Sequence, residues 1–320
     1  MRVVEIVGPR TSRVVEAPEP EPGPGEVLVR TLSLGVCASE RPVWTGHDGG
    51  SPARIGHELS GEVVGWGSDV YGWQVGDRVT GFAHPAFAEL VAVPSRDLEP
   101  VPANVPSWAA LGEPLACVVE AVSRSGIRAG ARVAVFGTGF MGLVATQVVR
   151  AAGAAEVLAL DVDPARLEIA ARVGADATFV LPDGGSGAGS GSTGDPAVVP
   201  ADLRASCDVV VEFTGTAAGL AAAGDLTRAH GTLCVGGYHH DGRRDLDVEL
   251  WYRSVTIVNG FSADRGRQRA ALRQGLALMA AREVTFEPLV THRLGLDGLD
   301  DAYELFRERP AGFVKAVLEP

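Results

Sequence analysis

The fold is decided by residues 133–142, which read VAVFGTGFMG. An apolar run, 133–136, is followed at once by three glycines and then by a helical pattern that we expect to reach about Ala152. Gly137 permits a tight turn, Gly139 lets backbone N–H groups approach a pyrophosphate, and Gly142 allows close packing of helix on strand. In this context the Gly-x-Gly-x-x-Gly spacing predicts a dinucleotide-binding loop.

Short apolar runs alternate with helical patterns on both sides of this loop. They predict strands over 132–136, 156–160, 208–213 and 231–236. Strands that alternate with helices form a parallel, doubly wound sheet, so we expect an α/β protein with a Rossmann domain. We place this domain at 116–284.

The first third of the chain has a different pattern, with short alternating runs between turn clusters, and is predicted to be β-rich. A helix over 299–307 and a strand over 313–318 close the chain and are expected to pack back on the first domain. The second domain is therefore predicted to comprise 1–115 and 285–320. Residues 182–200 are rich in Gly, Ser, Asp and Pro and are expected to form a flexible loop.

Composition narrows the class of protein. Hydrophobic residues make up 46% and charged residues 21%, which is enough apolar surface for buried cores. A net charge of −12 disfavours nucleic acid and anionic membranes as partners. The apolar stretch 133–149 is interrupted by glycines, and the chain starts with strand-like sequence and no signal segment, so we expect a cytoplasmic protein with no membrane span.

A carboxylate follows the second predicted Rossmann strand. Asp161 stands about 20 residues beyond the glycine loop, where it can bind the adenosine ribose and repel a 2′-phosphate, so it favours NAD over NADP. Alternatively, Asp161 only opens a turn before Pro164. Arg166 is either near the adenosine or an exposed helix residue. The predicted cofactor-binding residues are Gly137, Thr138, Gly139, Phe140, Met141, Gly142, Asp161, Arg166, Thr214 and Gly236.

A second group of chemically active residues precedes the Rossmann domain. Cys37, His57, Glu58 and Glu113 offer one thiol, one imidazole and two carboxylates, which suit zinc. Each residue alone is a weak signal, because a buried cysteine or a His-Glu pair is more often structural. None of the four cysteines belongs to a Cys-x-x-Cys pair, so no disulfide framework or zinc knuckle is indicated.

Taken together, these motifs resemble the medium-chain dehydrogenase/reductase superfamily in its zinc-dependent alcohol and polyol dehydrogenase branch. The resemblance covers nearly the whole chain and rests on GVC at 35–37, GHE at 56–58, VGDRV at 75–79, EPL at 113–115 and the nucleotide loop. It implies a GroES-like β-rich catalytic domain, an active site between the domains, and a homodimer or homotetramer.

The resemblance also implies residue roles. Cys37, His57 and Glu58 correspond to zinc ligands, and Glu113 to the glutamate that binds the metal or its water. Ser39 corresponds to the hydroxyl that accepts the substrate proton; with the three ligands it makes up the predicted catalytic set. Zinc lowers the pKa of an alcohol, Ser39 takes the proton, and hydride passes to nicotinamide. We expect an alcohol–ketone substrate pair, with polyols, sugars or cyclitols favoured.

The chain departs from relatives at two places. Residues 80–90, directly after 75–79, contain no cysteine, whereas many relatives carry a structural zinc lobe there, so we predict one zinc per subunit at most. Pro42 stands where some relatives end their proton relay in a histidine; His47 either substitutes or is an exposed loop residue. Trp44 and His84 are either pocket residues or packing residues.

Two rival functions are also compatible with parts of the sequence. One is a zinc-free NADPH-dependent enone or quinone reductase of the same superfamily, and the other is a non-catalytic dinucleotide-binding scaffold. The Cys/His/Glu set and Asp161 count against the first, and the intact catalytic set counts against the second.

Overall fold

The computed structural model describes residues 1–182, 199–239 and 243–320. The loop predicted at 182–200 falls almost wholly outside them. The chain divides into two compact units, Met1–Ala116 with Leu272–Pro320, and Cys117–Ala271, which we call the catalytic unit and the nucleotide unit. Helices α2 (Gly112–Ser125) and α7 (Arg265–Ala280) each contain a point where one unit passes into the other.

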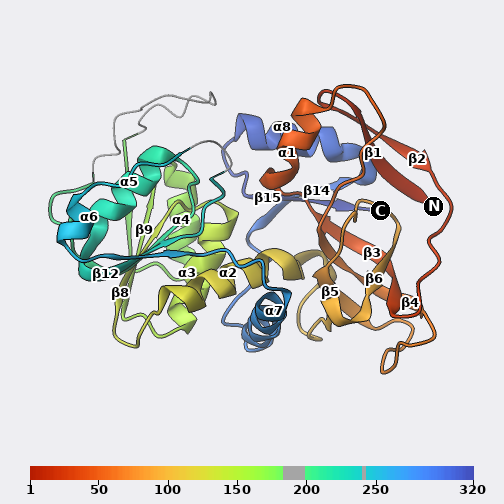
Figure 1. The fold of residues 1–320 in the computed structure, drawn as a ribbon, viewed down its shortest axis with the longest axis horizontal. Helices are drawn as coiled ribbons and strands as arrows, with labels where there is room; N and C mark the ends of the chain where they lie inside the picture. Colours follow the sequence, from red (N-terminus) through yellow and green to blue (C-terminus); the bar gives the residue numbers. More distant parts are fainter. Residues whose placement is uncertain (183–198, 240–242) are drawn as a thin grey trace. The chain divides into compact units, whose positions relative to one another are not determined.

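The nucleotide unit is built on a six-stranded parallel sheet in the order β10-β9-β8-β11-β12-β13 (Figure 1). Its strands are β8 (Arg132–Phe136), β9 (Glu156–Asp161), β10 (Ala177–Val180), β11 (Cys207–Glu212), β12 (Thr227–Val235) and β13 (Thr256–Asn259). The prediction of a doubly wound parallel sheet is confirmed. β12 begins four residues before the predicted start at Gly231, with Thr227 beside Cys207 ahead of a register shift.

The order of the strands reverses in the middle of this sheet. The chain first adds strands outward from β8 to β10 on one side, and then from β11 to β13 on the other side. The switch point, where doubly wound sheets bind ligands, thus lies between β8 and β11. Right-handed crossovers put α3 (Phe140–Ala151) and α4 (Pro164–Arg172) on one face and α5 (Ala217–Leu226) on the other. A short helix, α6 (Glu249–Tyr252), precedes the edge strand β13. The apolar side chains of β8, β9, β11 and α5 form a buried core.

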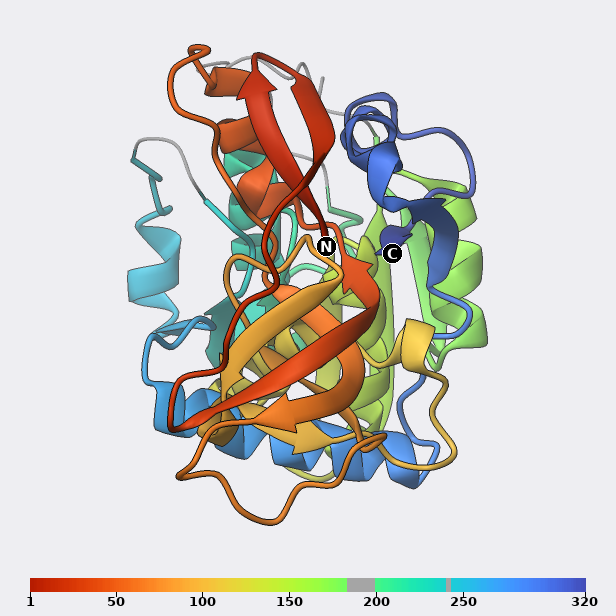
Figure 2. The same ribbon diagram turned by 90° about the vertical axis from the view of Figure 1, so that its right-hand side faces the viewer.

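The catalytic unit is β-rich, as predicted. A seven-stranded sheet has the order β14-β15-β3-β4-β5-β7, with β6 also paired to β3, and β1 and β2 form a separate antiparallel hairpin (Figure 2). The strands are β1 (Arg2–Gly8), β2 (Thr11–Glu16), β3 (Glu26–Gly35), β4 (Glu58–Trp66), β5 (Arg78–Phe82), β6 (Leu90–Pro94), β7 (Leu98–Pro100), β14 (Val290–Gly295) and β15 (Lys315–Glu319).

Two helices of this unit matter for its chemistry. The short α1 (Arg41–Gly46) follows a 3₁₀ turn, η1 (Ala38–Glu40), and α8 (Leu299–Glu308) packs on β14, β15 and β2. The predicted helix at 299–307 is thereby confirmed, and β15 covers most of the predicted strand at 313–318. Trp44 of α1 and Tyr303 of α8 belong to the buried core of this unit. Among the described residues, no helix combines the length and apolar character that a membrane crossing requires.

Candidate metal and cofactor sites

Strand pairing assembles a cluster of three potential metal ligands in the catalytic unit. β3 pairs antiparallel with β4, and Gly35 at the end of β3 lies opposite Glu58 at the start of β4. Cys37 follows β3 by two residues and His57 directly precedes β4, so both reach the same place as Glu58. Ligand atoms of the three side chains all lie within 4.8 Å of one another.

The Glu58 carboxylate is fixed on one side and open on the other. Its Oε1 accepts a hydrogen bond from Lys315 Nζ at 2.7 Å, and the same ammonium donates to the Val36 carbonyl at 2.9 Å. Both side chains are nearly inaccessible, at 1% and 3% exposure. Glu58 Oε2 is also buried and has no hydrogen-bond partner in the part of the chain that the structure describes. A buried carboxylate oxygen of this kind is stabilised by a cation or by a hydrogen-bond donor.

Gly35 makes room for this carboxylate. A Cβ atom at position 35 would overlap Glu58 Oε2 and press on the Glu58 Cβ at 2.9 Å. The glycine in the Gly-Val-Cys motif therefore has a steric reason, which is to let β4 bring Glu58 to the cluster.

The imidazole of His57 is oriented by a residue that the sequence analysis did not select. Glu40 Oε1 accepts the Gly56 N–H at 2.6 Å and lies 2.9 Å from His57 Nδ1. A carboxylate at Nδ1 fixes the proton there and leaves Nε2, which lies 4.0 Å from Glu113 Oε2, as the metal-binding nitrogen. The sequence does show an acidic residue three positions after Cys37. It does not show that the turn carrying this residue directs its carboxylate toward His57.

The cluster favours positive charge. Burial lowers the pKa of His57, but its hydrogen bonds to Cys37 and Glu40 outweigh that effect and raise this pKa to about 12. The same place therefore attracts a proton or a metal cation. One thiol, one imidazole and one carboxylate with an open buried oxygen are a zinc-type donor set, and the residues fit that metal.

The other predicted residues of this unit lie at different distances from the cluster. Ser39 is half-buried, and its hydroxyl donates to Cys37 Sγ at 3.2 Å. Glu113, in the first turn of α2, is next to His57 but outside the group of three. Trp44 is a core residue at 1% exposure, whereas His84 Nδ1 lies 3.2 Å from the Gly56 carbonyl.

The glycine loop of the nucleotide unit has the predicted form. Gly137 has a φ of 90°, and a Cβ at Gly142 would overlap the Gly137 carbonyl oxygen, so both positions require glycine. A Cβ at Gly139 would meet nothing within 4 Å. Gly139 directly precedes α3 and supplies no side-chain cap, so the helix N-terminus, where an anion binds favourably, is left without one.

Asp161 at the end of β9 closes one side of this loop. Its Oδ2 accepts from the Thr138 backbone at 2.5 Å and the Thr138 hydroxyl at 3.0 Å, and its Oδ1 accepts from the Asp163 backbone at 3.0 Å. Asp161 thus opens a turn and also braces the glycine loop. Arg166 lies 3.5 Å from Asp163 in an ion pair on α4.

The next strands of the sheet end in a second loop region. Thr214 donates from its backbone and hydroxyl to Glu212 Oε1, and the Gly215 N–H donates to the same oxygen at 2.9 Å. Glu212 Oε2 lies 3.0 Å from His239 Nε2. The buried Glu212 therefore holds together the loops at the ends of β11 and β12, where Thr214 and Gly236 were predicted to contact the cofactor.

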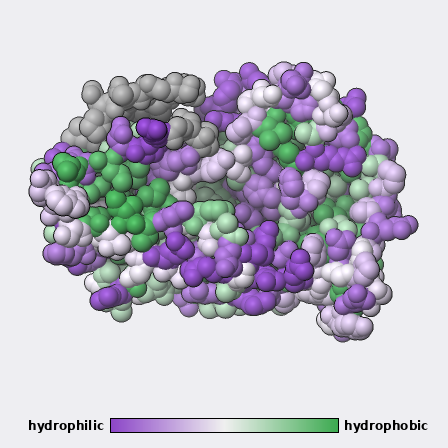
Figure 3. Space-filling model, viewed as in Figure 1, coloured by the Kyte–Doolittle hydropathy of each residue, from purple (hydrophilic) through white to green (hydrophobic). Residues whose placement is uncertain are grey.

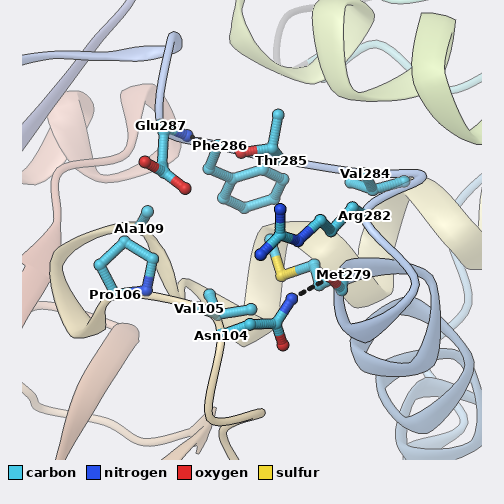
Figure 4. Close-up of a pocket in the computed structure, with 10 residues that line it drawn as sticks. All are labelled: Asn104, Val105, Pro106, Ala109, Met279, Arg282, Val284, Thr285, Phe286 and Glu287. Carbon is cyan, nitrogen blue, oxygen red and sulfur yellow. Dashed lines mark hydrogen bonds between the residues drawn. The ribbon is translucent and has the colours of Figure 1, made fainter.

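A surface hollow of about 300 Å³ lies elsewhere in the catalytic unit (Figure 4). Val105, Met279 and Phe286 are among its apolar lining residues, and the Arg282 guanidinium extends over it. None of the predicted metal or proton-transfer residues lines this hollow, so it is separate from the cluster.

Comparison with known proteins matches both units to one family. Residues 23–103 match the alcohol dehydrogenase GroES-like domain, and residues 141–281 match the zinc-binding dehydrogenase domain. Sorbitol dehydrogenase of Ovis aries is 31% identical over 93% of this chain and 91% of its own length.

Solved structures extend the comparison over the whole chain. An alcohol dehydrogenase from Thermus sp. ATN1 superposes with a TM-score of 0.83 at 25% identity and covers 100% of this chain and 99% of its own. A dehydrogenase from Sinorhizobium meliloti 1021, bound to NADP, superposes with a TM-score of 0.82 at 26% identity over 100% of this chain and 99% of its own.

Proposed function

The chain belongs to the zinc-dependent alcohol and polyol dehydrogenases of the medium-chain dehydrogenase/reductase superfamily, and from this premise we propose that it oxidises a secondary hydroxyl of a polyol with NAD. Membership makes it an oxidoreductase of the alcohol dehydrogenase type. The observation that carries the proposal is the cluster of Cys37, His57 and Glu58, in which one buried carboxylate oxygen is open.

In this proposal Cys37 Sγ, His57 Nε2 and Glu58 Oε2 hold a single zinc ion, and Glu113 lies close enough to bind it or a water beside it. Zinc, when bound, supplies a Lewis acid that lowers the pKa of the substrate hydroxyl. The chain's own residues orient the ligands, because Lys315 holds one oxygen of Glu58 and Glu40 fixes the imidazole tautomer.

Ser39 is the group that receives the substrate proton. Its hydroxyl is half-buried beside Cys37 and can accept a proton from the alcohol while it passes its own onward. His47 is held within its own exposed loop, because it lies 3.0 Å from the Ser51 carbonyl and accepts from the Gly49 N–H. This favours release of the proton to water. The C–H bond of the same carbinol carbon breaks as hydride to the nicotinamide, which leaves a ketone.

The glycine loop and Asp161 support NAD as the cofactor. The open start of α3 suits a pyrophosphate, and the carboxylate at the end of β9 disfavours a 2′-phosphate through like-charge repulsion. The solved relative from Sinorhizobium meliloti holds NADP, so the rate with NAD has to be compared directly with the rate with NADP.

Polyols are the proposed substrates because the ligand set and the Ovis aries relative, a sorbitol dehydrogenase, agree. A zinc-free enone reductase is disfavoured, since it has no use for a buried thiol–imidazole–carboxylate cluster. A scaffold is disfavoured for the same reason.

We propose that the enzyme is a homo-oligomer that associates through the nucleotide unit. β13 pairs only with β12 among the described strands, and large side chains around it are exposed. They are Tyr238, Val248, Trp251, Tyr252, Ile257 and Phe261. Figure 3 shows hydrophobic side chains gathered on the side of this unit that carries α5 and α6.

The proposed location is the cytoplasm. All four cysteines are described and none forms a disulfide, and the cluster requires Cys37 to stay reduced, which a reducing compartment ensures. Partners other than small molecules and further copies of the chain are not proposed, because the net charge of −12 repels nucleic acid and anionic lipid.

The test is the initial rate of NAD and NADP reduction over a panel of polyols and simple secondary alcohols, beside NADPH oxidation with an enone. We expect polyol oxidation with NAD, lost in Cys37→Ala and retained in Cys207→Ala, which removes a buried thiol from β11. Enone reduction with NADPH that survives Cys37→Ala contradicts the proposal.

A further inference from the structure

Two buried polar atoms beside the metal cluster, the Tyr303 hydroxyl and Glu40 Oε2, make no well-formed hydrogen bond with any residue that the structure describes. Tyr303 is 0% exposed. Native structures rarely leave a buried hydroxyl and a buried carboxylate oxygen both unsatisfied. One hydrogen bond between them satisfies both atoms.

Packing brings the two atoms toward each other. Glu40 directly precedes α1, and the Trp44 ring on α1 lies 5.2 Å from the Tyr303 ring, centroid to centroid. Trp44 Nε1 also donates to Asp300 Oδ1 at 2.8 Å, and Asp300 stands one helical turn before Tyr303 on α8. These two contacts tie one face of α8 to α1, so the Tyr303 side chain is held against the turn that carries Glu40.

Electrostatics agrees with this proximity. Burial raises the pKa of Tyr303 far above its ordinary range. The negative charges of Glu40, Cys37 and Glu58 raise it further, and so does a hydrogen-bond interaction with the Glu40 side chain. The hydroxyl therefore keeps its proton and is available as a donor to a carboxylate.

We propose that Tyr303 is a positioning residue for the metal cluster, in which its hydroxyl donates a hydrogen bond to Glu40 Oε2. Glu40 Oε1 is then held where it accepts the Gly56 N–H and the His57 Nδ1 proton. The order of contacts is Tyr303 to Glu40 to His57, and the last member presents Nε2 to the metal. This inference rests on the proposed function, because it requires that the cluster binds zinc.

The expected size of the effect follows from the position of Tyr303. Removing a group that directly orients a metal-binding histidine lowers metal affinity by about 10- to 100-fold. Tyr303 acts one contact further out, so its hydroxyl is expected to contribute about 10-fold, at the lower end of that range.

The experiment is zinc affinity, measured on the full chain by competition of the zinc ion with a chromophoric chelator. Tyr303→Phe removes one oxygen and keeps the ring that packs on Trp44, so the fold is expected to remain. We expect zinc to bind about 10-fold more weakly in Tyr303→Phe. Tyr71→Phe, a change at an 85% exposed tyrosine of the same unit, is the matched control and keeps wild-type affinity.

A second background separates positioning from packing. In Glu40→Gln the oriented carboxylate is gone, so adding Tyr303→Phe is expected to weaken zinc no further. An effect of Tyr303→Phe that is equal in both backgrounds overturns the proposed contact.

The remaining outcomes are also decisive. If Tyr303→Phe raises the melting temperature of the zinc-free protein and leaves zinc affinity unchanged, the hydroxyl is an unsatisfied packing atom and the inference is wrong. If the wild-type chain itself does not bind zinc, the proposed function fails, which this assay distinguishes from failure of the Tyr303 contact alone.

Discussion

The metal cluster of the catalytic unit and the glycine loop of the nucleotide unit are built in opposite ways. The cluster consists of side chains just after β3 and at the start of β4, and its Glu58 carboxylate depends on the Lys315 ammonium of β15. The loop consists of backbone groups between β8 and α3, with Asp161 accepting from the Thr138 N–H. The cluster is therefore defined by the chemistry of its ligand atoms, and the loop by the space that its glycines leave free.

This difference predicts how each site fails. A side-chain site loses its chemistry when one donor is removed, and its buried partners are then left with uncompensated charge. A backbone site loses its form when a Cβ enters it, whatever the chemistry of the added group. The two sites lie in separate compact units, so each is expected to survive damage to the other.

Metal removal is expected to have the largest effect. Stripping zinc with a chelator should lower the rate of alcohol oxidation by about 1000-fold, since the Lewis acid is worth several kcal/mol in the transition state. NADH affinity, followed by fluorescence titration, should stay within about twofold, because the loop uses no cluster residue. Loss of NADH binding along with zinc would show that the two sites are not independent.

The buried ion pair is the next test. In Lys315→Met the Glu58 carboxylate keeps its charge but loses its ammonium partner, and the zinc-free protein should lose about 3–5 kcal/mol of unfolding free energy. The matched control is Arg30→Met, which breaks the exposed ion pair with Glu62 and should cost about 0–1 kcal/mol. Denaturant unfolding measures both. Equal losses of unfolding free energy in the two variants would contradict the expectation that breaking the buried pair costs more than breaking the exposed one.

The smallest expected effect compares two glycines of one loop. Gly142→Ala places a Cβ on the Gly137 carbonyl and should destabilise the nucleotide unit by about 1–3 kcal/mol. Gly139→Ala meets only open space and should leave stability within about 0.5 kcal/mol, while NADH binding weakens by about 10-fold. Thermal unfolding and NADH titration together check the pair. If Gly139→Ala binds NADH normally, the pyrophosphate does not approach this glycine.

Local sequence accounts for much of this fold and for less of its metal cluster. β8 has the predicted bounds because an apolar run and a glycine loop lie side by side in the chain. The Gly35–Glu58 register and the Glu40–His57 contact depend on strand pairing, which local patterns do not encode. Lys315 lies 257 residues from Glu58, so no spacing could reveal their contact.

Family resemblance filled part of that gap. It directed attention to Cys37, His57 and Glu58, which the structure brings together, although their roles as ligands stay a prediction. It did not select Glu40 or Tyr303, because their importance comes from what they face inside the catalytic unit.

Zinc content per chain tests the central claim most directly. Elemental analysis of protein purified without added metal should find about one zinc per chain in the wild type and in Cys207→Ala, and almost none in Cys37→Ala. Zinc that stays bound in Cys37→Ala, or a wild-type chain that is active on polyols without any metal, would contradict the assignment of the cluster.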